Sequence, residues 1–192
     1  MLTIDKYYPN WNELSIHESA PSDDSLSNKL KDNCKSFTAT QYYRGQPNGK
    51  IINGFRNEDL ENQTFKDESF DIVITQDVME HIYEPEKAFM EIARTLKKGG
   101  ACIFNVPIIN KHKETEIWAT KGKGGKPEFL KNPEYHKNPV DLEGSPVTMH
   151  RGFDIVDYIK KRAAWKLIIE YINNLGYGIR AEYIEVLVTV KK

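Results

Sequence analysis

The fold of this chain is decided by residues 70–108, which read FDIVITQDVMEHIYEPEKAFMEIARTLKKGGACIFNVPI. Residues 70–75 are a β-branched run of the kind found in parallel sheets that are covered on both faces. Pro85 suits a first helical position, and apolar residues then recur at helical spacing up to Leu96. Residues 97–100, KKGG, are typical of a helix end, and residues 101–108 predict a second buried strand. The stretch therefore predicts a β-α-β unit with a right-handed crossover.

Weaker patterns extend this unit in both directions. Upstream, residues 14–17 and 37–43 predict strands, and residues 24–31 predict a helix between them. Downstream, residues 153–174 have the periodicity of an amphipathic helix, and residues 177–181 and 184–190 predict two closing strands. Strands that alternate with helices predict one α/β domain over residues 1–192.

Residues 109–150 break this alternation. They contain the run KGKGGK at 121–126, four prolines and scattered aromatic residues. A segment of this length with weak periodicity is usually a functional loop or lid, or else it is disordered. We expect an insertion that forms a lid over a binding site.

Composition excludes several classes of protein. The 192 residues contain 27 Lys+Arg and 28 Asp+Glu, so no positive excess favours binding to nucleic acid. No run of 18 apolar residues predicts a membrane span, and the first residues contain no apolar signal segment. Cys34 and Cys102 form neither a disulfide framework nor a zinc motif, so we expect a cytoplasmic protein. Nothing in the sequence indicates an oligomeric state.

Residues 56–82 and 88–107 resemble the middle of a class I S-adenosylmethionine-dependent methyltransferase, of the type-11-like branch. The resemblance rests on an ordered set: Asp59-Leu60, the Phe70-Asp71 strand, Glu80-His81, and the run LKKGG at 96–100. It implies a three-layer, Rossmann-like fold with a mostly parallel, seven-stranded sheet. It also implies S-adenosylmethionine (SAM) as cofactor and methyl transfer to a small-molecule or glycan-related acceptor, with residues 109–150 as the insertion over the acceptor site.

The resemblance assigns cofactor contacts at the carboxyl ends of the strands, where α/β sheets bind ligands. The Asp59 carboxylate would accept from the adenine amino group, and the backbone N–H after it, at Leu60, would meet a ring nitrogen. Gln76 and Asp77 would form a wall of the cleft. An alternative for Asp59 is that it only caps or solvates a loop.

Two departures from the family pattern motivate a second hypothesis. The turn after the first strand, HESAPS at 17–22, contains no glycine, and the second strand ends in a neutral glutamine instead of a carboxylate. The contacts assigned to these two strand ends are Glu18, Ser19, Ala20, Gln41 and Tyr42. The second hypothesis is a methyltransferase-like module that has lost catalysis and acts in binding or scaffolding.

Asp77, Glu80 and His81 are spaced i, i+3, i+4, so a helix beginning at Asp77 would place them on one face. One interpretation is a divalent-metal site similar to the Glu/Glu/His trio of the branch that methylates quinone precursors, with Asp77 replacing a Glu. A second is that His81 acts as a general base. A third is that the acids cap the helix and His81 packs on the sheet. We assign His81, and His136 from the insertion, as catalytic residues, and no metal ligand.

Overall fold

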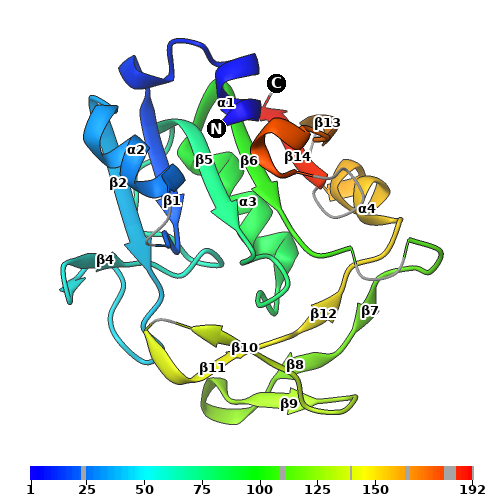
Figure 1. Ribbon diagram of the computed structural model, residues 1–192. Helices are drawn as coiled ribbons and strands as arrows, with labels where there is room; N and C mark the ends of the chain where they lie inside the picture. Colours follow the sequence, from blue (N-terminus) through cyan, green and yellow to red (C-terminus); the bar gives the residue numbers. More distant parts are fainter. Residues whose placement is uncertain (23–24, 109–110, 139, 163–164, 180–184, 192) are drawn as a thin grey trace.

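A central eight-stranded sheet organises the chain (Figure 1), and the computed structural model describes residues 1–22, 25–108, 111–138, 140–162, 165–179 and 185–191. The helices are α1 (Leu2–Tyr7), α2 (Ser25–Asn33), α3 (Pro85–Thr95) and α4 (Ile155–Arg162), with 3-10 turns at Trp11–Glu13, Lys123–Gly125 and Leu175–Tyr177. The central strands are β1 (Ser15–Ser19), β2 (Ser36–Gln41), β3 (Ile51–Ile52), β4 (Phe55–Asn57), β5 (Phe70–Gln76), β6 (Leu96–Asn105), β13 (Trp165–Tyr171) and β14 (Glu185–Lys191).

The strand order is β13-β14-β6-β5-β1-β2-β4-β3. β1 pairs in parallel with β2 on one side and with β5 on the other, so the strand order reverses direction at β1. β14 and the short β3 are antiparallel to their neighbours. The mostly parallel α/β sheet predicted from the sequence is thereby confirmed, with one short strand more than expected. Ligands in such sheets bind beyond the carboxyl ends of the strands at the reversal point.

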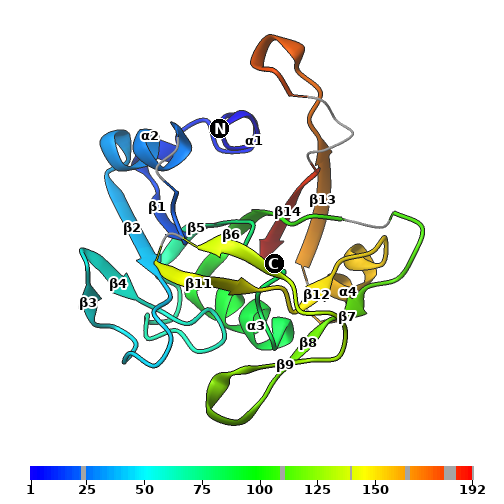
Figure 2. The same cartoon turned by 60° about the horizontal axis from the view of Figure 1, so that its bottom comes forward.

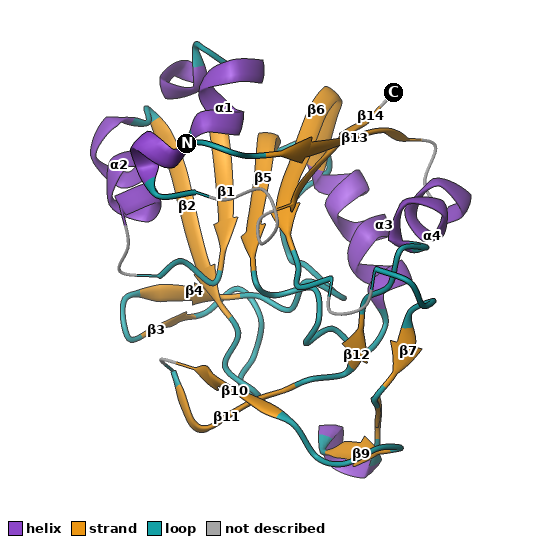
Figure 3. Cartoon of the chain, turned by 45° about the vertical axis from the view of Figure 1, so that its right-hand side comes forward, coloured by secondary structure: helices purple, strands orange, loops and turns teal. Residues whose placement is uncertain are grey.

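Two hydrophobic cores lie on opposite faces of the sheet, because successive side chains of a strand point to opposite sides. In β5, Val73 faces the core formed with α3 and α4, whereas Ile72 and Ile74 face the core formed with α1 and α2. Figure 3 shows the two helix pairs on the two sides of the sheet. The arrangement is the three-layer sandwich that the resemblance implies.

The β5-α3-β6 unit is confirmed, with two shifted boundaries. Pro85 begins α3 as predicted, and the helix ends at Thr95, before the KKGG run. That run belongs to β6, where a register irregularity relative to β5 accommodates Gly99 at φ 78°. A helix that starts at Asp77 is wrong: residues 77–84 form turns, and Asp77 itself has φ 50°.

The prediction of one helix over residues 153–174 is wrong. α4 ends at Arg162, and Trp165–Tyr171 is the edge strand β13, which pairs antiparallel with β14. Its β-branched and aromatic residues favour a strand once β14 offers a partner, and this overrides the helical periodicity. The strand expected at 177–181 is also wrong where the structure describes it, because Tyr177 ends a 3-10 turn, and residues 180–184 lie outside the described residues. The last predicted strand is confirmed as β14.

The described residues of the insertion form three two-stranded sheets beyond the carboxyl ends of the central strands. Two of these sheets are hairpins. β8 (Ala119–Lys121) pairs with β9 (Pro127–Phe129), and β10 (Tyr135–Asn138) pairs with β11 (Asp141–Pro146). β12 (Met149–His150) pairs with β7 (Glu116–Ile117). Figure 2 shows β10 and β11 in front of the strand ends. In the described part of the chain, every helix is too short or too polar to cross a lipid bilayer.

Helix α3 provides a direct test of the packing. Ile92 is fully buried between α3 and the sheet, whereas Met90 on the same helix is 66% exposed. We expect Ile92→Ala to lower the free energy of unfolding by about 2–5 kcal/mol, because it leaves a cavity. Met90→Ala should change it by less than about 0.5 kcal/mol. Urea unfolding followed by circular dichroism measures both, and equal effects would contradict the assigned face.

His17 makes the stability depend on pH. It is fully buried in β1, where Nε2 lies 2.9 Å from Thr40 Oγ1 and the ring packs on Phe65 and Phe70. Burial lowers the pKa of His17 from 6.5 to about 3, so the folded state holds the ring neutral. The unfolded chain takes up a proton below pH 6.5, and this contribution to stability is therefore lost as pH falls from 6.5 toward 3.

We expect the wild-type free energy of unfolding to fall more steeply between pH 6.5 and pH 4 than that of His17→Gln. The exposed His112 provides the control variant His112→Gln, whose pH profile should parallel that of the wild type. Chemical denaturation at a series of pH values gives the profiles. Parallel curves for His17→Gln and the wild type would show that His17 does not cause the effect.

Candidate functional site

A cavity of about 650 Å³ lies at the carboxyl ends of β1, β2, β4 and β5, where the strand order reverses. Its volume falls in the range of small-molecule sites, about 300–1,000 Å³. Eight of the predicted cofactor residues line it: Ser19, Ala20, Gln41, Tyr42, Asp59, Leu60, Gln76 and Asp77. Residues that are distant in sequence thus share one wall, because parallel strands end at the same edge of the sheet.

The turn after β1 has the backbone that a glycine would usually supply. Ala20 has φ 54°, in the left-handed region, and its N–H donates to Thr40 O at 2.8 Å. This conformation costs an L-residue roughly 1–2 kcal/mol. The Gln41 side-chain amide donates to Pro21 O at 3.2 Å and joins the turn to the end of β2. The missing glycine therefore does not close the cavity.

Asp59 follows β4, and its side chain both holds a local turn and lines the cavity. Its Oδ1 accepts the N–H of Glu61 at 2.8 Å, which forms a local turn, and the half-buried residue also lines the cavity. Burial is the main cause that raises the pKa of Asp59. The neighbouring Leu60 is 4% exposed. A carboxylate held by its own turn at the cavity wall is oriented before any ligand arrives.

The end of β5 supplies a second strained position. Asp77 has φ 50°, and its Oδ1 accepts from Asn105 Nδ2 at 3.1 Å, which ties the ends of β5 and β6 together. Burial raises the pKa of Asp77. Strained residues such as Ala20 and Asp77 concentrate at functional sites, where the surrounding structure holds them in place.

Glu18 and His136 do not line the cavity among the described residues. Glu18 is 1% exposed, and its Oε1 accepts from the Ser27 hydroxyl on α2 at 2.9 Å. Its side chain is thus oriented toward the helix. Asp71, which the sequence analysis did not place in the site, accepts from Ser15 N and Lys97 Nζ at the opposite end of the strands.

The rest of the cavity is lined by residues that the sequence analysis missed. Glu61 is one of them: Oε1 accepts the N–H groups of Tyr83 and Glu84, and Oε2 pairs with Lys121 of the insertion at 3.2 Å. Arg44, which also lines the cavity, pairs with Glu143 of the insertion at 3.2 Å. Glu61 and Arg44 lie in turns, and their partners lie in short strands of the insertion, so only the tertiary structure shows that they meet.

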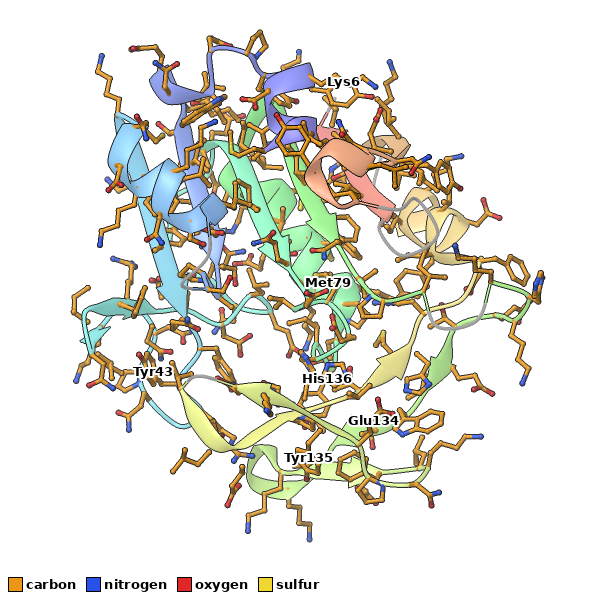
Figure 4. All side chains as sticks on the ribbon, in the orientation of Figure 1. Lys6, Tyr43, Met79, Glu134, Tyr135 and His136 are labelled. Atoms are coloured by element: carbon orange, nitrogen blue, oxygen red, sulfur yellow. The ribbon has the colours of Figure 1, made fainter. Side chains whose placement is uncertain are left out.

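The acid and histidine motif after β5 lies in turns, and β10 of the insertion completes it. Glu80 is 2% exposed, and neither carboxylate oxygen has a hydrogen-bond partner. His81 lines the cavity, and its Nδ1 lies 2.8 Å from Pro146 O. The His81 and His136 rings meet edge to face at 5.0 Å between centroids. Figure 4 shows His136 on the side of β10 that faces the turn of Met79, and Tyr135 on the other side.

This geometry bears on the three interpretations of the motif. The capping interpretation does not fit, because α3 begins at Pro85 and its N-cap residue, Glu84, makes no side-chain cap hydrogen bond. Burial lowers the pKa of His81, which favours the neutral ring. Burial also raises the pKa of Glu80 to about 7. Neutral His81 at the cavity wall fits either a base or a metal ligand.

Comparisons with known proteins agree with the fold. Residues 27–104 match a family described as a methyltransferase domain. No curated protein matches.

Among solved structures, a SAM-dependent methyltransferase from Mesorhizobium loti is 13% identical, with a TM-score of 0.61 over 100% of this chain and 96% of that one. One described as putative, from Listeria monocytogenes, is 12% identical, with a TM-score of 0.61 over 100% and 97%. The 1,6-didemethyltoxoflavin-N1-methyltransferase of Burkholderia thailandensis, solved with bound 1,6-didemethyltoxoflavin and S-adenosylhomocysteine, is 7% identical, with a TM-score of 0.59 over 100% and 76%. The chain thus has the fold of class I SAM-dependent methyltransferases, and residues 27–104 match their methyltransferase domain family.

Proposed function

We propose that this protein transfers a methyl group from SAM to a small-molecule acceptor, with a glycan-related compound among the candidates. The observation that carries the proposal is the cavity at the strand-order reversal, with Asp59, Gln41 and the Ala20 turn in its wall. The methyltransferase-domain match of residues 27–104 covers three of the strands that end there, β2, β4 and β5.

The wall residues suit the parts of the cofactor in order along the sheet edge. Asp59 would accept from the adenine amino group, and the Leu60 N–H would donate to a ring nitrogen. Gln41 has its amide nitrogen turned to Pro21 O, so its Oε1 is the atom to accept from a ribose hydroxyl. Ser19 and Ala20 are small enough for a close approach of the methionine part.

When bound, SAM supplies a methyl group on a positively charged sulfur, which is already a strong electrophile. The task of the chain is then to align the acceptor in line with that methyl group and to exclude water. The insertion serves this task, since the pairs Lys121–Glu61 and Arg44–Glu143 hold it across the cavity. To His81 at the cavity wall, and to His136, whose ring packs edge to face on His81 from outside the wall, we assign the activation of the acceptor.

The alternative, an inactive binding module, was motivated by the glycine-free turn and the neutral Gln41. Ala20 adopts the left-handed conformation itself, so the turn does not need a glycine. Gln41 has no charge, but its side-chain oxygen can still accept a hydrogen bond at the same strand end. The alternative therefore makes one distinct prediction, namely that SAM does not bind.

Asp59 tests the cofactor site. We expect Asp59→Ala to weaken SAM binding about 10-fold to 100-fold, because it removes a charge-assisted hydrogen bond. Asp59→Asn keeps the oxygen that accepts from Glu61 N and should lose less affinity. Asp32→Ala changes an exposed carboxylate on α2 and should have no effect. Isothermal titration calorimetry gives the affinities. Unchanged affinity in Asp59→Ala would remove Asp59 from the site, and no binding in the wild type at millimolar SAM would support the inactive module.

Catalysis is tested with a labelled donor. The wild type, incubated with methyl-tritiated SAM and a small-molecule cell extract, should move label into the extract. His81→Ala should lower this rate by about 100-fold or more while its SAM affinity stays unchanged. His112→Ala is the matched control and should behave as the wild type. A His81→Ala rate equal to the wild-type rate would leave His81 with a structural role only.

A further inference from the structure

Three side chains from two distant segments converge beside the cavity. Glu80 Oε1 lies 3.8 Å from His81 Nε2 and 3.7 Å from His136 Nδ1, and all three atoms lie within 4.8 Å of one another. Glu80 and His81 come from the turn after β5, and His136 comes from β10 of the insertion. From this cluster we infer a binding site for a divalent first-row transition ion, with Glu80, His81 and His136 as protein ligands.

The ionised form of Glu80 needs a positive partner at this position. It is 2% exposed, and neither oxygen accepts a hydrogen bond in the described structure. A buried carboxylate without partners is costly, because desolvation is not compensated. A bound cation between Glu80 and the two imidazoles would supply the compensation.

The tautomer of His81 leaves the correct nitrogen for a metal. Its Nδ1 lies 2.8 Å from Pro146 O, and a carbonyl oxygen can only accept, so Nδ1 carries the proton. In the neutral ring, Nε2 then presents a lone pair toward Glu80. Metal-binding histidines commonly donate their other N–H to a backbone carbonyl in this way.

His136 has the matching arrangement with a carboxylate. Its Nδ1 faces Glu80, and its Nε2 lies 3.6 Å from Glu134 Oε1. The other oxygen of Glu134 lies 2.8 Å from His150 Nε2, which fixes the position of the carboxylate. The 3.6 Å contact is longer than a hydrogen bond, and it would have to shorten when an ion binds to become the carboxylate–histidine hydrogen bond that orients metal ligands and raises their basicity.

The three donors must move closer together to hold an ion. An ion about 2.0–2.2 Å from each donor holds tetrahedral donors about 3.3 Å apart. The two donor distances from Glu80 exceed that value by about half an ångström. The donors of His81 and His136 lie within 4.8 Å of each other, so rotation of the partly exposed His136 ring must bring them together when an ion binds. Two imidazole nitrogens and one carboxylate oxygen suit Zn²⁺, Co²⁺ or Fe²⁺ and not Mg²⁺ or Ca²⁺.

This ligand set differs from the trio read from the sequence. Asp77 is replaced by His136, because the turn after β5 is not helical and Asp77 instead accepts from Asn105. A rival explanation is that the buried Arg151 neutralises Glu80. The Arg151 guanidinium lies over the Tyr158 ring at 5.0 Å, and none of its nitrogens has a hydrogen-bond partner in the described structure. The rival predicts that no metal binds.

The role of the ion rests on the proposed function. His81 lines the cavity, so an ion on its Nε2 would lie at the cavity wall. Three protein ligands leave a position for an exchangeable one, as in catalytic metal sites. An acceptor hydroxyl at that position would have a lowered pKa, which makes a hydroxyl-bearing acceptor the fitting class.

Metal binding is tested without any acceptor. The protein is treated with EDTA, freed of the chelator by gel filtration, and titrated with ZnCl₂ and with CoCl₂ in a calorimeter. We expect one ion per chain and no heat with MgCl₂. Co²⁺ should also give the visible absorption of a site with nitrogen and oxygen ligands.

Variants identify the ligands. Glu80→Gln, His81→Ala and His136→Ala should each weaken binding by about 100-fold or more, and Glu134→Gln by about 10-fold to 100-fold. His112→Ala should bind as the wild type does. Thermal unfolding in EDTA checks that each variant is folded. We expect His136→Ala to have the least effect on the fold, because its side chain is 38% exposed. If a variant at a buried position unfolds, His136→Ala still tests whether the cluster binds the ion.

The inference is overturned if the wild type binds neither Zn²⁺ nor Co²⁺, or if both Glu80→Gln and His136→Ala bind with wild-type affinity. SAM binding is measured separately on the EDTA-treated protein. If SAM binds and the ions do not, this inference fails and the proposed function stands. If the ions bind at these residues and SAM does not, the metal site stands and the proposed function fails.

Discussion

The pairing of β1 with β2 on one side and with β5 on the other is the constraint on which the rest of the structure depends. Because the chain leaves β1 toward one side and later returns on the other, no connection crosses the edge where these strands end. That edge is left open, and residues at or just after the ends of β1, β2, β4 and β5 line the resulting cavity. The cores on the two faces hold the strands in register and thereby fix the positions of the strand ends.

The site contains strain at both strand ends next to the reversal point. Ala20 and Asp77 occupy the left-handed region without being glycine, and each is held by a hydrogen bond to the neighbouring strand end. The backbone must turn tightly after β1 to leave the cavity open, and the strained residue at that turn is the small Ala20. The packing of the surrounding sheet offsets the free-energy cost of this strained conformation.

The sequence predicts the β5-α3-β6 unit because its β-branched run, Pro85 and helical periodicity all indicate the same structure. The periodicity of residues 153–174 indicates a helix, and it fails because β13 is stabilised by pairing with β14, a long-range contact. Strand ends could be located from sequence, so eight predicted cofactor residues are found at one wall. Glu61, Lys121 and Arg44 could not be predicted, because turns and an irregular insertion bring them together.

The cluster of Glu80, His81 and His136 could likewise be predicted only in part from the sequence. Glu80 and His81 are adjacent and stand out in the sequence, but their helical interpretation is wrong, and their partner His136 lies 55 residues further along the chain. Local spacing groups Asp77 with these two residues, whereas His136 is the third member of the cluster in the described structure. The tertiary structure instead brings β10 over the turn after β5 and makes the insertion part of the site.

The central claim is that the strand-end cavity binds the nucleoside of the cofactor. A crystal structure of the protein grown with S-adenosylhomocysteine tests it most directly. The account predicts electron density for an adenosine with its base beside Asp59 and its ribose beside Gln41. Density for the nucleoside elsewhere on the molecule, or a cavity filled by the protein's own side chains, would contradict it.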